Sequence, residues 1–274
     1  MKKWALHFLI FMFFIFEPVG AKAFENHLPG ARSAAMAGAT VALPGSEALF
    51  QNPSSLSYEE KLSFILSYES RFLMKELSLM AAGIILPTRS GTFGGSYIRF
   101  GTGVYQENRI GLVYAKKLGK LISAAVGFDY LSVTLPENSR PFSALTVESG
   151  LTAGIPGKYT GALYVFNPVM AKLKLPGGKV PVPWSVRVGN TWFINNWLLL
   201  CSELDFTPKK PAGLHTGLEF NPCPEISVRA GISGCPFQIT AGAGFKMGNV
   251  VFDIAFSHHG YLGFSPTAGI RFTP

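Results

Sequence analysis

The chain has 274 residues, a formal net charge of +8 and a mean hydropathy of +0.27, yet only 15 % of its residues are charged. No apolar run after residue 23 approaches the roughly 20 residues of a transmembrane helix, which excludes a bundle of membrane-spanning helices. The Lys and Arg residues form no cluster with interleaved aromatic residues, so we expect no nucleic-acid partner. An apolar chain built from short alternating segments instead favours a surface that faces lipid.

The first 23 residues have the features of an export signal. Two lysines precede an apolar run over residues 4–16, and the triplet Ala-Lys-Ala at positions 21–23 is of the kind that signal peptidases cut after. The run is too short to span a bilayer as a helix, which makes an uncleaved anchor the weaker alternative. We predict a cleaved signal peptide over residues 1–23 and a mature protein that begins at Phe24.

Residues 24–60 do not show the alternation of a strand. Residues 30–40 carry mainly small side chains. The stretch that follows is rich in Pro, Gly and Ser, and it ends with Asn52-Pro53-Ser54-Ser55-Leu56 shortly before the first predicted strand. We therefore treat residues 24–60 as a segment of its own and residues 61–274 as the sheet.

From about residue 61 onward, apolar and polar side chains alternate with a period of two, which is typical of strands with two unlike faces. In residues 237–247, for example, Phe, Ile, Ala and Met alternate with Gln, Thr, Gly and Lys. Most such segments have about ten residues, the length that a tilted strand needs to cross a bilayer. The pattern predicts fourteen strands, near residues 61–69, 76–86, 90–100, 104–115, 120–134, 144–155, 158–167, 184–193, 197–206, 212–221, 225–233, 236–246, 249–257 and 262–273.

The connections between these strands alternate in length. Every second one is tight, as at Pro156-Gly157, whereas most of the others are longer; those near 101–103 and 234–235 are exceptions. Bacterial outer-membrane barrels have an even number of strands, short periplasmic turns and longer outer loops. The sequence therefore predicts an all-β fold, a transmembrane antiparallel β-barrel of 14 strands, although the ambiguous residues 168–183 leave 12 strands open.

A soluble sandwich or a lipocalin-like barrel is the competing all-β interpretation. In such a fold the apolar face points inward, and large side chains fill a small barrel. Here the opposite face carries Gly, Ser, Thr and charged residues, which suits a water-filled or plugged lumen. The membrane barrel is therefore preferred.

Strand alternation places charged side chains on the inner face of the barrel, since Arg or Lys facing mid-bilayer costs about 2–4 kcal/mol. The candidate lumen residues are Asp129, Glu148, Arg187, Glu203, Asp205, Glu219, Arg229, Lys246, Asp253 and Arg271. They form either a charged constriction that selects solutes or a structural lattice of salt bridges.

The remaining reactive residues do not make a convincing catalytic or metal site. His258 and His259 are neighbours on a predicted outer connection, and adjacent residues on a strand point to opposite faces, so they make a poor chelate. Ser257, His258 and Ser265 are close in sequence, but no set of oxyanion donors accompanies them. We expect no enzymatic activity, no metal and no cofactor.

The three cysteines are predicted to be unpaired within the chain. Cys223 falls in an inner turn and Cys235 at an outer loop, a strand length apart, while Cys201 falls mid-strand on the lumen side. Aromatic residues near the predicted strand ends are candidates for girdles at the membrane interfaces. These residues are Tyr68, Phe72, Phe128, Tyr130, Trp184, Trp192, Trp197, Phe206 and Phe272.

Several short motifs resemble those of the FadL-like outer-membrane barrels, in particular the PorV/PorQ branch associated with type IX secretion. The stretch Asn52-Pro53-Ser54-Ser55-Leu56 resembles an Asn-Pro-Ala-Gly-Leu-like motif of that family and departs from it at the third and fourth positions. The other similar motifs are Gly161-Ala162-Leu163 with Asn167, Gly217-Leu218-Glu219-Phe220, and Thr240–Phe245 followed by Ser257-His258-His259 and Leu262-Gly263. Their order, rather than any single motif, carries the resemblance.

The resemblance implies a fourteen-stranded barrel whose segment 24–60 folds into the lumen as a plug, with Asn52 and Pro53 in the plug motif. It also implies transport of hydrophobic solutes or a part in protein secretion, in the outer membrane of a Gram-negative bacterium. The implied partners are outer-membrane lipid and either hydrophobic small molecules or a secreted cargo protein. A sealed structural or adhesion barrel without transport is the alternative.

Overall fold

The computed structural model describes residues 24–103, 105–135, 141–175, 178–234 and 236–274. The predicted signal peptide and Cys235 lie outside the described residues. None of the helices within the described ranges is long and apolar enough to cross a membrane.

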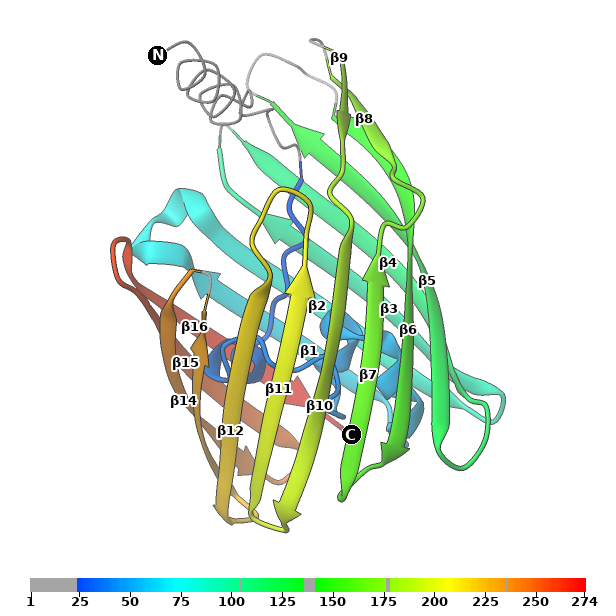
Figure 1. Cartoon of the computed structure of the whole chain (residues 1–274), viewed down its shortest axis with the longest axis vertical. Helices are drawn as coiled ribbons and strands as arrows, with labels where there is room; N and C mark the ends of the chain where they lie inside the picture. Colours follow the sequence, from blue (N-terminus) through cyan, green and yellow to red (C-terminus); the bar gives the residue numbers. More distant parts are fainter. Residues whose placement is uncertain (1–23, 104, 136–140, 176–177, 235) are drawn as a thin grey trace, which may run out of the picture.

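Fourteen antiparallel strands close into a barrel (Figure 1). The closing pair is β1 with β16, where Phe64 lies opposite Phe272. The barrel strands are β1 (Ser63–Ser70), β2 (Ser78–Thr88), β3 (Gly91–Phe100), β4 (Gln106–Lys117), β5 (Ile122–Thr134), β6 (Phe142–Ile155), β7 (Tyr159–Phe166), β10 (Ser185–Asn195), β11 (Leu198–Phe206), β12 (Gly213–Cys223), β13 (Ile226–Ser233), β14 (Gln238–Met247), β15 (Val250–His259) and β16 (Gly263–Phe272). The predicted all-β, fourteen-stranded transmembrane barrel is confirmed, with strand ends shifted by a few residues.

The ambiguous residues 168–183 form a hairpin outside the barrel wall. Its strands, β8 (Lys172–Leu175) and β9 (Gly178–Pro181), pair with each other, and β7 pairs directly with β10 across the excursion. The hairpin stands above the barrel rim in Figure 1. Leu173 anchors it, because this side chain is fully buried in an apolar cluster with Tyr164. The wall therefore has fourteen strands and not twelve.

The two faces of the wall differ as the period-two pattern predicts. On β4, Arg109 and Val113 are at most 4 % exposed, whereas Ile110 and Leu112 are 49 % and 66 % exposed. Large apolar side chains are exposed in this way on strands all around the barrel. A closed sheet satisfies its backbone hydrogen bonds internally, so an apolar outer belt of this kind can face hydrocarbon.

The connections give the barrel two unlike ends. At the end where β1 begins and β16 finishes, strands follow one another through tight turns such as the one between β14 and β15; we call it the turn end. At the opposite end, the loop end, the β1–β2 connection contains the short helices η2 (Arg71–Leu73) and η3 (Lys75–Leu77), and the β7–β10 connection contains the hairpin.

The N-terminal segment, residues 24–60, lies inside the barrel (Figure 1). It contains the short helices α2 (Ala31–Ala35), α3 (Ala48–Gln51) and η1 (Pro53–Tyr58). Helix α2 packs against β13 to β16, whereas η1 packs against β3 to β6, so the segment bridges the lumen. Apolar contacts support it, because Leu49, Phe50 and Leu56 are buried against the inner side chains of the wall. Burial of each such side chain stabilises the fold by about 1.5–3 kcal/mol.

Glycines on the inner face allow the segment to approach the wall closely. A Cβ atom on Gly217 would lie 2.7 Å from the Cβ of Met36, and one on Gly150 would lie 2.0 Å from the side-chain oxygen of Asn52. Either contact would be far shorter than a van der Waals distance. The glycine-rich face therefore accommodates a filled lumen.

Candidate functional site: a loop-end cavity above a packed segment

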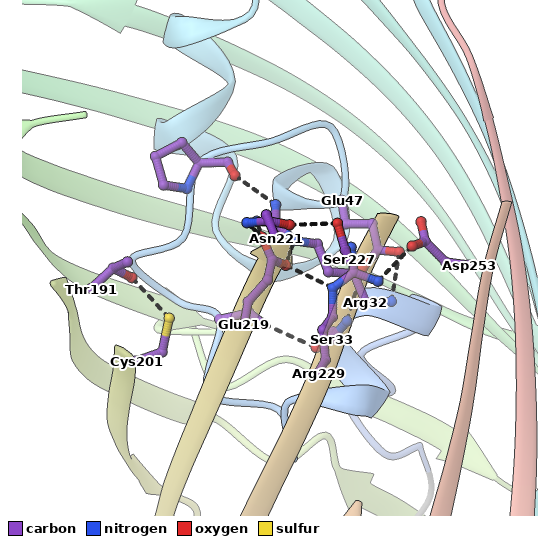
Figure 2. A network of polar contacts seen from close by, with 12 residues as sticks. Arg32, Ser33, Glu47, Thr191, Cys201, Glu219, Asn221, Ser227, Arg229 and Asp253 are labelled. Carbon is purple, nitrogen blue, oxygen red and sulfur yellow. Dashed lines mark hydrogen bonds and ion pairs between the residues drawn. The ribbon is translucent and has the colours of Figure 1, made fainter. Parts of the chain in front are cut away.

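The first of three polar networks joins α2 to strands β12, β13 and β15 (Figure 2). The Arg32 guanidinium donates from Nε to Glu219 Oε2 at 2.7 Å and from Nη2 to Glu219 Oε1 at 2.8 Å. Arg229 donates to the same Glu219 carboxylate and to Asp253, both at 2.6 Å. Two arginines and two carboxylates thus balance in charge, and the bidentate pair fixes the orientation of α2.

Glu47 holds the two halves of the segment together. Its carboxylate accepts hydrogen bonds from the backbone N–H groups of Arg32 and Ser33, at 3.1 and 3.0 Å. These N–H groups have no partner within the first turn of a helix, and a negative charge is favourable there. Gln51 adds a hydrogen bond from its side-chain nitrogen to the carbonyl oxygen of Pro29, at 2.9 Å. Helices α2 and α3 are therefore held as one unit.

The second network centres on Arg187 of β10. It pairs with Glu203 at 2.5 Å and donates to the carbonyl oxygens of Gln51 and Gly38, each at 3.0 Å. The Glu203 carboxylate in turn accepts the N–H of Val41 at 2.8 Å. The pair is buried; the guanidinium Nε donates to Glu203 of the wall, and both Nη atoms donate to backbone carbonyls of the segment.

The third network centres on Arg109 of β4. It pairs with Asp129 and with Glu148, each at 2.7 Å, and donates to the side-chain oxygen of Asn26 at 2.9 Å. In each of the three networks, an arginine links a carboxylate of the wall to the segment. This arginine belongs to the segment in the first network (Arg32) and to the wall in the other two (Arg187 and Arg109).

Asn52 and Pro53 lie where α3 passes into η1. The Asn52 amide donates to the carbonyl oxygen of Val41 at 2.8 Å, and its oxygen accepts from the Ser54 hydroxyl at 2.7 Å. The Ser54 hydroxyl also lies 2.7 Å from the Thr152 hydroxyl on β6. Pro53 occupies the first position of η1, where its missing N–H is not needed. These contacts fold the segment back on itself and attach it to the wall.

A cavity of about 420 Å³ remains at the loop end, above the packed helices. Phe24, Leu28, Phe100 and Trp184 supply aromatic and aliphatic surface to it. Its size falls in the range of pockets that enclose small organic molecules, which are usually lined by apolar side chains with a few polar groups.

Apart from Glu107, which has no arginine or lysine partner among the described residues, the charged side chains that line this cavity occur in pairs. Glu25 pairs with Lys210, and Asp205 pairs with His215 at 2.7 Å. The Arg187 pair with Glu203 forms part of the floor. Because the opposite charges neutralise one another locally, the cavity presents no single-sign field that would concentrate ions.

Two smaller cavities, of about 260 and 150 Å³, lie at the turn end. Lys246 and Arg271 line both of them, and Lys61 lines the larger. The folded segment and its networks stand between these cavities and the loop-end cavity. The turn-end cavities are lined mainly by charged and polar side chains of both signs, whereas the loop-end cavity also offers aromatic surface.

The structure brings together most of the lumen residues that the sequence proposed. Glu219, Arg229 and Asp253 belong to one network, and Arg187 belongs to another. Lys246 and Arg271 lie outside these networks and line the turn-end cavities. The further candidates Asp129, Glu148 and Glu203 are also buried in these networks, and Asp205 faces the loop-end cavity.

The charged lumen residues that sequence reasoning did not single out include Arg32, Glu47, Glu107 and Arg109. The last two could have been found, because the alternation of β4 turns both to the same face as Val113. No comparable signal marks Arg32 or Glu47, which lie on a segment without strand alternation.

Ser257 and His258, which are neighbours in the sequence, do not point toward one another. Ser257 and His258 lie on opposite faces of β15, and the His258 ring packs on Phe264 with 4.6 Å between ring centroids. His259 accepts N–H groups of the β15–β16 connection through its Nδ1 atom. In the part of the chain that the structure describes, no group of three or more His, Cys, Asp or Glu residues could hold a metal ion.

Cys201 is a buried lumen residue whose sulfur lies 3.2 Å from the Thr191 hydroxyl, and Cys223 ends β12; both are free thiols. Trp192, Trp197 and most other predicted girdle aromatics are exposed on the barrel. Trp184 is an exception, because it lines the loop-end cavity. It lies in a connection just before β10, where strand alternation does not fix the direction of a side chain.

No protein-family model matches the chain, and no curated protein matches its sequence. Solved structures do match. The CymD monoaromatic hydrocarbon channel superposes with a TM-score of 0.68 at 11 % identity, covering 92 % of this chain and 99 % of that chain. The Pseudomonas putida toluene transporter TodX gives 0.64 at 11 % identity, covering 93 % and 98 %. A Pseudomonas aeruginosa FadL homologue gives 0.62 at 12 % identity, covering 89 % and 96 %. The chain thus has the barrel fold of these channels over nearly its whole length.

Proposed function

We propose that the protein is an outer-membrane channel for the uptake of small hydrophobic solutes, exported by means of its N-terminal signal. The observation that carries the proposal is the loop-end cavity, which offers aromatic surface at one end of a closed fourteen-stranded barrel. The similarity in fold to a monoaromatic hydrocarbon channel and to a toluene transporter supports it.

The chemistry of the cavity favours uncharged solutes. Its charged groups are paired or, in the case of Glu107, already hold several hydrogen-bond donors, so a charged solute would lose hydration and gain little counter-charge. An apolar or aromatic solute gains contacts with side chains such as Phe100 and Trp184. Capture would occur at the loop end, which faces outward when the tight turns face the periplasm.

Movement past the cavity requires the segment 24–60 to shift. Below the cavity floor, the buried networks of Arg32 and Arg187 and the apolar side chains of η1 occupy the lumen. We infer that the segment acts as a gate, and that its packed position in the lumen is the closed one. Asn52 and Pro53 shape this closed position, and Arg187, Glu219, Arg229 and Asp253 of the predicted lumen charges hold it in place.

The experiment is uptake of a fluorescent naphthylamine dye by Gram-negative cells that express the protein. Trp184→Ala and Phe100→Ala should each slow the initial rate by about fivefold, the equivalent of about 1 kcal/mol of lost aromatic contact. Trp197→Ala is the matched control, because Trp197 is an aromatic residue on the outer surface near the turn end and should leave the rate unchanged. Uptake no faster than in cells without the protein would contradict the proposal.

Two other functions give different results in the same assay. A sealed structural or adhesion barrel would show no uptake in any variant. A part in protein secretion, which the motif resemblance to the PorV/PorQ branch supports, would leave dye uptake low and would make export of a cargo protein depend on the loop-end connections. The longest of these is the β7–β10 connection, which carries the β8–β9 hairpin.

A further inference from the structure

Glu107 is a buried carboxylate at the loop end that collects hydrogen-bond donors from the start of the segment. Its two oxygens accept from the backbone nitrogens of Phe24 and Glu25, at 3.1 and 3.2 Å. The His27 Nε2 atom lies 3.0 Å away, and the Tyr105 hydroxyl also donates to it. Burial and the neighbouring Glu107 carboxylate raise the pKa of the Tyr105 hydroxyl above its usual value, so the hydroxyl remains a donor.

Glu107 differs from the other buried carboxylates of the wall in lacking an arginine. Asp129 and Glu148 pair with Arg109, and Glu203 pairs with Arg187. Glu107 is only 5 % exposed, and the one cationic side chain that the described residues bring within ion-pair distance is His27. A buried carboxylate without a cation is costly, so the position calls for a positive charge.

His27 is poorly placed to supply that charge. Its Nδ1 atom is buried and has no hydrogen-bond partner among the described residues. A protonated imidazole would bury a charged N–H group there without an acceptor, whereas a neutral imidazole leaves only an acceptor atom bare. The geometry therefore fits a neutral His27 that donates from Nε2, and the counter-charge must come from elsewhere.

The backbone nitrogen of Phe24 is the atom that signal peptidase would convert into an α-ammonium group by cutting after Ala23. We propose that the mature protein anchors its new N-terminus in this way, as a buried ion pair between the Phe24 ammonium and the Glu107 carboxylate. The inference rests on the cleavage predicted from the Ala-Lys-Ala triplet at 21–23, and it does not depend on what the cavity takes up.

Two further features agree with cleavage at this bond. Phe24 has a φ of 79°, a conformation that an L-residue adopts only at a cost, and cleavage removes the peptide bond that defines this angle. The Phe24 side chain is 3 % exposed and packs in the apolar cluster of Val41 and Tyr164, which holds the nitrogen beside Glu107. Only the cleaved chain would have an ammonium group that pairs with Glu107. Cleavage would therefore fix the position of the first residues of the segment, which form part of the cavity lining.

The test measures how readily the α-amine of the purified, folded barrel reacts with a reagent selective for N-terminal amines. Intact mass and N-terminal sequencing should first show that the chain begins at Phe24. The native α-amine should then react about a hundredfold more slowly than that of the unfolded chain, because a buried group reacts only on local opening. Glu107→Gln should speed the native reaction by about tenfold or more, through loss of the pair. Glu25→Gln is the matched control and should change little, since this neighbouring carboxylate pairs with Lys210 in solvent.

A second variant keeps Glu107 and moves the ammonium instead. A serine inserted between Ala23 and Phe24 would place the new N-terminus about 3.5 Å further along the chain. Its α-amine should react nearly as fast as that of Glu107→Gln. A mature protein that begins at another residue, or equal native rates for the unaltered protein and the insertion variant, would overturn the proposal.

Discussion

The two halves of the lumen are built from one continuous segment but by different chemistry. Near the turn end, α2, α3 and η1 are held by bidentate ion pairs, backbone hydrogen bonds and apolar side chains seated against wall glycines. At the loop end, residues 24–29 form neither helix nor strand, and they border a cavity with aromatic lining. The first half is packed like a protein core, and the second leaves room for another molecule.

The segment therefore has two roles, closure of the lumen and lining of the cavity, that can be separated by mutation. Substitutions in the packed half should change stability and the tightness of closure. Substitutions around the cavity should change capture of solute and leave the fold nearly intact.

Arg32→Ala should have the largest effect. It removes the bidentate partner of Glu219 and frees α2 from the wall, and loss of one partner of a largely buried pair typically costs about 3–5 kcal/mol. Urea unfolding in lipid vesicles should show the loss, and single-channel recording should show a larger ion conductance than that of the unaltered protein. Arg271→Ala is the control, because Arg271 lines the turn-end cavities without an ion pair among the described residues, and it should change stability by less than about 0.5 kcal/mol.

Gly217→Ala should have an intermediate effect. The added Cβ would lie 2.7 Å from the Met36 Cβ and 2.8 Å from the Met36 carbonyl oxygen, so α2 must shift away from β12. Overpacking of this kind costs about 1–3 kcal/mol in the same unfolding experiment. Gly119→Ala makes the same chemical change in a turn where nothing lies within 4 Å of the new atom. Equal stabilities of the two variants would mean that α2 does not rest against this wall.

Glu25→Gln should have the smallest effect on stability. Burial raises the pKa of the Glu25 carboxyl, but the hydrogen bond and charge of Lys210 outweigh it and bring the pKa below its usual value. A lowered pKa means that the pair stabilises the fold above the ordinary carboxyl pKa of about 4.3 and that this contribution is lost as the pH falls through the lower value. The side chains are 46 % and 53 % exposed, so the loss near pH 7 should stay below about 1 kcal/mol. The difference from the unaltered protein should vanish in acid; a difference that grows in acid would contradict the assignment.

The barrel wall could be predicted from sequence because its signal is local and repeats on every strand. The alternation that turns Leu112 outward and Val113 inward is visible in the chain itself. The same alternation also turns Glu107 and Arg109 inward, so these two residues could have been predicted as lumen charges. The directions of side chains in the connections were harder to predict. Trp184, for example, was assigned to an interfacial girdle, although it lines the cavity.

The contacts of the segment could not be predicted in the same way. Arg32 and Glu219 are far apart in sequence, and nothing near Arg32 indicates which carboxylate it meets. Such pairs are decided by how the segment docks in three dimensions. A family resemblance can suggest the docking, but periodicity cannot.

The most direct test of the account is a disulfide between the segment and the wall. With the native cysteines replaced by serine, Ala31→Cys and Gly269→Cys should cross-link, because a Cβ atom on Gly269 would lie 3.1 Å from the Ala31 Cβ, close to the 3.5–4.5 Å of a disulfide. Pairing Ala31→Cys with Gly119→Cys provides the control. The account predicts nearly complete oxidation of the first pair in folded protein and none of the second. Two cysteines that stay reactive toward a thiol reagent in the first pair would mean that the segment does not lie against the inner wall.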